Sequence, residues 1–159
     1  MFWSFKKKQN IGLYAPVNGK TIALEHVPDQ VFAQKMMGDG IAFDPESNLI
    51  CAPCDGVITM LANTLHAVGI TAGNGAEILI HIGLDTVNLG GKGFKALVKS
   101  GEKVTQGTPL IEVDMEFMKE QNMVLTTPMV VTNSADYKMV VNTLESHVII
   151  GKDEVISFN

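Results

Sequence analysis

The chain contains 159 residues, of which 46% are hydrophobic and 18% charged, and its formal net charge is −5. This length and composition are typical of one globular domain, and the acidic balance argues against a nucleic-acid partner because no basic stripe offsets phosphate repulsion. No apolar run approaches the roughly 20 residues that span a bilayer, and the N-terminus lacks a secretory-signal pattern, so we expect a cytoplasmic monomer.

Residues 1–10 are expected to form a flexible tail before a single domain over residues 11–159. In this tail the aromatic residues Phe2, Trp3 and Phe5 precede three lysines at positions 6–8. Such a cluster suits weak contact with an anionic membrane surface. A frayed terminus whose aromatic side chains touch the domain is the alternative interpretation.

Short β-rich runs separated by glycine and proline follow along the chain at intervals of about eight to twelve residues. The clearest runs cover residues 20–24, 49–52, 57–61, 67–71, 76–82, 110–113, 129–132 and 147–150. This spacing predicts an all-β protein, an antiparallel β-sandwich or a hybrid of barrel and sandwich, rather than alternating strands and helices.

Two short peripheral helices are predicted. The first covers residues 29–37, with Asp29 as its N-cap after Pro28, and the second follows Asp114 through residue 121. On the first helix, Phe32 and the two methionines at positions 36 and 37 either form an apolar surface ring or pack in the core.

A weak internal echo links the two halves of the chain. The sequence Ala-Pro-Val-Asn-Gly at residues 15–19 returns as Ala-Pro-Cys-Asp-Gly at residues 52–56, each time before a β-like run. Either a supersecondary unit is duplicated, or both copies are examples of a common strand–turn arrangement.

Two cysteine- and glycine-rich motifs are interpreted as structural. Cys51 and Cys54 have CxxC spacing, but a strand would place them on opposite faces and no second CxxC is present, so we expect small buried side chains. The Gly90-Gly91-Lys92-Gly93 stretch lacks the hydroxyl residue of a phosphate-binding loop and predicts a turn. Residues 38–40, Gly-Asp-Gly, also predict a turn.

Two histidines flank an Asn-Gly pair, the strongest short-range hairpin signal in the chain. With a two-residue loop at Asn74 and Gly75, Val68 would lie opposite His81, and the rings of His66 and His81 would be diagonal neighbours on one face. A three-residue loop would shift the register by one and put the rings on opposite faces.

A pair of imidazoles of this kind suits phosphoryl chemistry. A neutral imidazole keeps a lone pair at pH 7, so His81 can attack phosphorus directly. Thr64, two residues before His66, can fix the tautomer of that ring and leave its other nitrogen to donate a hydrogen bond to a phosphoryl oxygen. Structural packing and a metal pair are the alternatives, although zinc needs three or four ligands and we expect no metal.

Several motifs closely resemble the glucose-type enzyme IIA component of the bacterial sugar phosphotransferase system. They are residues 29–40, 52–56, the Thr-Leu-His-Ala run at 64–67, and the Glu-Ile-Leu-Ile-His-Ile-Gly-Leu-Asp-Thr-Val run at 77–87. The resemblance continues through residues 93–94, 101–107 and 132–133, so it covers almost all of the chain after Asn10. Cys54 departs from it, because the family usually has valine there.

The resemblance implies a phosphotransferase that forms a phosphohistidine intermediate without a cofactor. His81 would accept the phosphoryl group from the histidine-containing phosphocarrier protein and pass it to a cysteine of a IIB domain during sugar uptake. His66 would be the second active-site histidine and Thr64 its supporting residue. The expected partner-binding residues are Asp29, Asp85, Phe32, Met36, Met37 and Val87. No IIB or membrane segment is recognised, which suggests a free-standing IIA protein.

Three other functions remain open from the sequence. A zinc endopeptidase would need a His-x-His pair, which His81-Ile-Gly83 does not supply. A lipoyl- or biotinyl-type carrier module is suggested by residues 101–107, with Lys138 as its faint modification site. A mainly regulatory protein that reports sugar flux by binding other proteins would keep the same fold.

Overall fold

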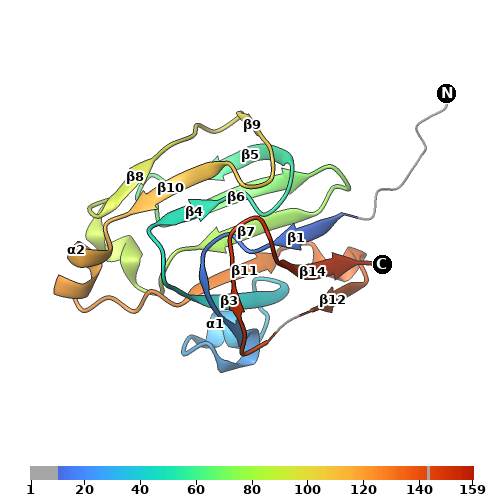
Figure 1. Ribbon diagram of the computed structural model, residues 1–159, viewed down its shortest axis with the longest axis horizontal. Helices are drawn as coiled ribbons and strands as arrows, with labels where there is room; N and C mark the ends of the chain where they lie inside the picture. Colours follow the sequence, from blue (N-terminus) through green and yellow to red (C-terminus); the bar gives the residue numbers. More distant parts are fainter. Residues whose placement is uncertain (1–10, 143) are drawn as a thin grey trace.

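Most of the regular secondary structure lies in antiparallel sheets, with short helices at their periphery (Figure 1). This computed structural model describes residues 11–142 and 144–159. The all-β prediction is therefore confirmed. The predicted tail over residues 1–10, with its membrane contact, lies outside the described residues. Within the described ranges, no helix is long and apolar enough to cross a membrane.

The largest sheet has eight strands and carries the histidine hairpin near its centre. In spatial order these strands are β13 (His147–Val148), β2 (Gly19–Ala23), β3 (Asp39–Pro45), β11 (Thr127–Val131), β7 (Glu77–His81), β6 (Ala67–Ala72), β5 (Gly56–Leu61) and β9 (Lys103–Val104). All neighbouring strands in it pair antiparallel.

Two three-stranded sheets complete the architecture. One has the order β1 (Gly12–Tyr14), β14 (Glu154–Phe158) and β12 (Met139–Val141), and the other β4 (Leu49–Cys51), β10 (Pro109–Val113) and β8 (Phe94–Ala96). Leu13 and Ile111 of these small sheets share one buried cluster with Phe43, Ile70 and Ile80 of the large sheet. The main core thus lies between the sheets, as in a sandwich.

The predicted strands are all present, with ends that differ by at most two residues from the observed ones. The turn predicted at residues 38–40 is partly wrong, because Asp39 and Gly40 already belong to β3. Only Gly38 has a positive φ, +122°. A Cβ on Gly40 would lie 2.1 Å from the Met129 carbonyl oxygen. Glycine is therefore needed here because the backbone of β11 comes too close for a side chain.

Both helices begin where the sequence predicts. Asp29 caps α1 (Gln30–Ala33) by accepting the Val31 N–H at 2.9 Å, and Asp114 caps α2 (Met115–Glu120) by accepting the Phe117 N–H at 3.0 Å. The predicted length of the first helix is wrong. Lys35 has φ +60°, a left-handed conformation that ends the helix before residue 37. In the described part of the chain, three 3-10 turns accompany the two helices: η1 (Leu24–His26), η2 (Thr86–Leu89) and η3 (Ser134–Asp136).

The internal echo corresponds to a duplicated arrangement of strands. Residues 15–19 and 52–56 lie against each other, because the Tyr14 N–H donates to the Pro53 carbonyl (2.8 Å) and the Cys51 N–H to the Pro16 carbonyl (2.7 Å). Each copy then enters a strand of the large sheet, β2 or β5, whose first residue pairs with a two-residue strand, β13 or β9. The two small sheets also share one topology. The structure therefore favours duplication over a coincidental turn motif.

Candidate active site: a histidine pair at the end of the β6–β7 hairpin

His81 is the last residue of β7 and faces away from the main core. Along this strand Ile78 and Ile80 are 2% and 1% exposed in the main cluster, whereas Leu79 belongs to a second cluster on the other face of the sheet. His81 shares the face of Leu79 because side chains alternate along a strand. Its ring lies 5.0 Å from that of Phe32, a member of the same second cluster.

The hairpin loop has three residues, so the predicted two-residue loop is wrong. Ala67, not Val68, lies opposite His81, and Thr71 pairs with Glu77. The Ala72 N–H donates to the Ala76 carbonyl at 2.9 Å, which leaves residues 73–75 as the loop. Gly75 has φ +87°, as expected for the left-handed residue of a three-residue hairpin loop.

The two imidazoles nevertheless lie in contact. The ring centroids of His66 and His81 are 4.9 Å apart, and the rings meet edge to face at 80°. His66 precedes β6, and Leu65 before it has φ +59°, so strand alternation does not govern the direction of the His66 ring. The predicted ring contact is confirmed, whereas the inference that a three-residue loop would separate the rings is wrong.

Hydrogen bonds fix the tautomer of His81 and engage one ring nitrogen of His66. His81 Nδ1 lies 2.7 Å from the Gly83 carbonyl oxygen. A carbonyl only accepts, so Nδ1 carries the proton and the lone pair resides on Nε2. His66 Nδ1 lies 2.5 Å from Thr64 Oγ1. When the Thr64 hydroxyl donates to that nitrogen, the Nε2–H of His66 is available as a donor.

Both imidazoles are biased towards the neutral form. Burial lowers the pKa of His66, and the neighbouring His81 lowers it further. Burial also lowers the pKa of His81, outweighing the opposite effects of the Gly83 carbonyl and the Asp29 carboxylate. A lowered pKa keeps both rings uncharged at pH 7, and His81 is then a competent nucleophile.

Exposed apolar side chains lie on α1, whose Phe32 contacts His81, on the turn after α1, and on η2, which begins five residues after His81. Met36 is 68% exposed, Met37 39% and Val87 46%. Val31, which the sequence analysis did not single out, is 43% exposed on α1. Its position two residues after the predicted cap Asp29 was the available signal. Phe32 is 5% exposed, so it packs beneath the site and does not belong to the exposed ring.

The two acidic residues of the expected rim lie beside these apolar groups. Asp29 precedes α1 and is close enough to His81 for its charge to raise the pKa of that ring. Asp85 is exposed and occupies the N-cap position of η2. Each carboxylate therefore stands at the start of an element that bears an exposed apolar residue.

The cysteine and glycine motifs have structural roles, as predicted. Cys51 and Cys54 are buried free thiols, and burial together with the Asp55 carboxylate raises the pKa of Cys54 to about 12. Such a thiol stays protonated and unreactive at neutral pH. The stretch at residues 90–93 forms a turn in which all three glycines have positive φ.

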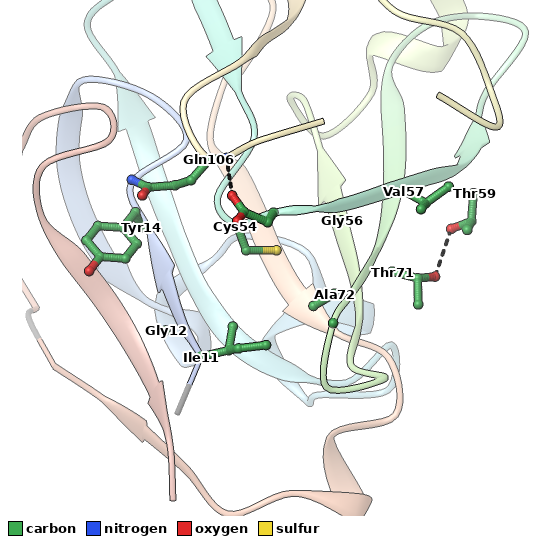
Figure 2. A pocket seen from close by; sticks show the side chains of 12 residues that line it. Ile11, Gly12, Tyr14, Cys54, Gly56, Val57, Thr59, Thr71, Ala72 and Gln106 are labelled. Carbon is green, nitrogen blue, oxygen red and sulfur yellow. Dashed lines mark hydrogen bonds between the residues drawn. The ribbon is translucent and has the colours of Figure 1, made fainter. Parts of the chain in front are cut away.

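A separate hollow of about 710 Å³ lies between the beginning of β1 and the β5–β6 hairpin (Figure 2). Its lining contains Tyr14, Cys54, Val57 and Ala72 but no histidine. The Asp55 carboxylate there already accepts the Gln106 N–H at 2.8 Å. The paired imidazoles therefore do not belong to this hollow.

The fold and the histidine pair define a β-sandwich protein with two imidazoles in contact at the end of one hairpin. Residues 11–137 match the family described as phosphoenolpyruvate-dependent sugar phosphotransferase system, EIIA 1. A solved structure, glucose permease IIA from Mycoplasma capricolum, is 35% identical with a TM-score of 0.86, and the match covers 98% of this chain and 99% of that one. The chain belongs to this EIIA family, whose members transfer phosphoryl groups in sugar uptake.

Proposed function

We propose that Nε2 of His81 accepts a phosphoryl group from the phosphohistidine of the histidine-containing phosphocarrier protein and passes it to a cysteine of a IIB domain. The observation that supports this most directly is the hydrogen bond from His81 Nδ1 to the Gly83 carbonyl, which leaves Nε2 with its lone pair. In the transfer, the phosphorus–nitrogen bond of the carrier breaks as the bond to Nε2 forms. The proton of His81 stays on Nδ1, hydrogen-bonded to the Gly83 carbonyl.

His66 is the proposed donor to the transferring group. Its ring lies against His81, and the Thr64 hydroxyl at Nδ1 directs a proton to Nε2. A neutral donor placed in advance stabilises negative charge on the phosphoryl oxygens without reorganisation during the reaction. Thr64 is a positioning residue in this scheme, because it acts through His66.

The surrounding surface is the proposed docking site for both partners. Asp29 and Asp85 would attract basic side chains, while Met36, Met37 and Val87 would exclude water from the labile phosphorus–nitrogen bond. Phe32 would support this surface from below. We propose that residues 11–159 act as one cytoplasmic unit in this exchange, and that binding of further proteins for regulation uses the same surface.

Incubation of the full chain with phosphoenolpyruvate and the general phosphotransferase proteins tests the assignment. We expect one acid-labile phosphate on His81, located by mass spectrometry, and no uptake by His81→Ala. His147→Ala is the matched control, because that histidine is exposed on β13 and its Nδ1 contacts Glu46. Phosphate on any other residue, or normal uptake by His81→Ala, would contradict the proposal.

A further inference from the structure

The loop after His81 is held by hydrogen bonds to fixed partners on both sides. The Ile82 N–H donates to the His66 carbonyl at 2.6 Å, and the Leu84 N–H donates to the Val124 carbonyl at 3.1 Å. Between them, the Ile82 carbonyl accepts the hydroxyl of Thr86, whose side chain is completely buried. Ile82 therefore connects the backbone of His66 to the Thr86 side chain.

The conformation of Gly83 depends on its close packing against Thr86. Its φ is +79°, and a Cβ there would lie 2.6 Å from Thr86 Cγ2 and 3.0 Å from the Val124 carbonyl oxygen. Only glycine fits this position, both for its φ and for its contacts. In this conformation the Gly83 carbonyl turns back to the ring of His81, two residues earlier, and accepts its Nδ1–H.

We infer that Thr86 is the positioning residue that keeps Nε2 of His81 free for phosphoryl transfer. Its hydroxyl holds the Ile82 carbonyl and so fixes the Ile82–Gly83 peptide. The orientation of this peptide sets the backbone direction at Gly83 that brings the Gly83 carbonyl to Nδ1 of His81. Without that donor, the buried Ile82 carbonyl would have to rotate towards another partner. The Gly83 carbonyl would then leave the ring, and the proton would spend part of its time on Nε2, where it blocks attack.

The expected effect on phosphoryl transfer rests on the proposed function. The tautomer of His81, by contrast, can be measured without any partner protein. Nitrogen-15 NMR of the full chain at neutral pH reports which ring nitrogen is protonated. We expect the Nδ1–H tautomer in the unmodified protein and in Thr86→Ser, which keeps the hydroxyl. Thr86→Val keeps the shape but lacks the donor, and should show a mixture of tautomers.

Phosphoryl uptake from the carrier gives the second readout. Thr86→Val should lower kcat by about tenfold with an unchanged KM, since misplacement of a reacting group by up to about 1 Å costs as much as 10²-fold. Thr21→Val is the matched control. Thr21 is also completely buried and donates its hydroxyl to a backbone carbonyl, that of Ser146, on the distant strand β2. This control should lose stability without any change in tautomer or kcat.

The outcomes separate the inference from the proposed function. An unchanged tautomer in Thr86→Val, or a changed one in Thr86→Ser, would overturn the positioning role. A mixed tautomer in Thr86→Val together with no phosphate on His81 of the unmodified protein would instead overturn the proposed function alone. If Thr86→Val does not fold, Thr86→Ala takes its place with the same expected result. Alanine also lacks the hydroxyl donor and is smaller than threonine, so it causes no steric clash.

Discussion

At the scale of single residues, the chemistry depends on which nitrogen of each imidazole carries a proton. The Gly83 carbonyl assigns His81, and the Thr64 hydroxyl bonds the corresponding nitrogen of His66. The Thr64–His66 bond was predictable, because both residues lie within one short motif. The Gly83 contact was not predicted, since it depends on a positive φ at Gly83 and on the packing of Thr86 against it.

The proposed division of labour between the histidines predicts different effects on the two half-reactions. His66→Ala should still accept phosphate from the carrier but pass it to the IIB cysteine more slowly, by about 10²-fold, as when one preorganised donor is removed. His66→Gln keeps an N–H donor and should recover part of the rate. Rapid-quench measurement of each half-reaction separates the steps, and an equal loss in both would refute this division.

At the scale of elements, the starts of helices were easier to predict than their ends. Asp29 and Asp114 cap their helices through contacts with residues two or three positions ahead, so local sequence suffices. The end of α1 depends on Lys35, whose ammonium group lies 3.5 Å from Glu25 and 3.5 Å from Asp39. Asp39 lies at the start of β3, so both contacts of Lys35 depend on where β3 and η1 lie next to the end of α1.

The two roles of Asp29, as a helix cap and as a rim charge, can be separated by substitution. Asp29→Asn should leave the free energy of unfolding almost unchanged, because asparagine caps helices as well as aspartate, whereas Asp29→Ala should lower it by about 1 kcal/mol. Both variants should associate more slowly with the carrier and with a weaker salt dependence. Chemical denaturation and stopped-flow binding measure these effects. Unchanged association in both variants would remove Asp29 from the proposed docking surface.

At the scale of the whole molecule, the duplicated architecture places the histidine hairpin near the middle of the large sheet. β7 pairs with β11 on one side and β6 on the other, so the backbone of His81 is fixed by the sheet while its ring remains half-exposed. The corresponding pair of strands in the other half, β3 and β11, contains no histidine. The candidate site is thus confined to one of the two similar halves.

The lowered pKa values of both histidines predict a dependence of overall stability on pH. As the pH falls through about 6.5, the unfolded chain binds protons before the folded protein does. The free energy of unfolding should therefore decrease towards acid and level off above this range. Chemical denaturation at several pH values between 5.5 and 8 measures this free energy. The range lies above the titration of ordinary carboxylates, so the histidines dominate the change.

The double variant His66→Gln, His81→Gln is the control for this dependence. It retains His26 and His147, so any contribution of these two histidines to the pH dependence is common to both proteins. Its stability should vary less with pH than that of the unmodified protein over the same range. Equal slopes in the two proteins would show that the paired histidines titrate normally in the folded state.

The sequence by itself determined the class of fold, most strand positions, both helix caps and the contact between the two histidines of the candidate site, because these depend on short motifs and local periodicity. Tertiary structure decided the three-residue hairpin loop, the tautomer of His81 and the burial of Phe32. Those features arise where strands, turns and side chains from distant parts of the chain compete for the same space and the same hydrogen-bond partners. His66 shows the difference most clearly: its partner was predictable from the sequence, but the turn at Leu65 that directs its ring was not.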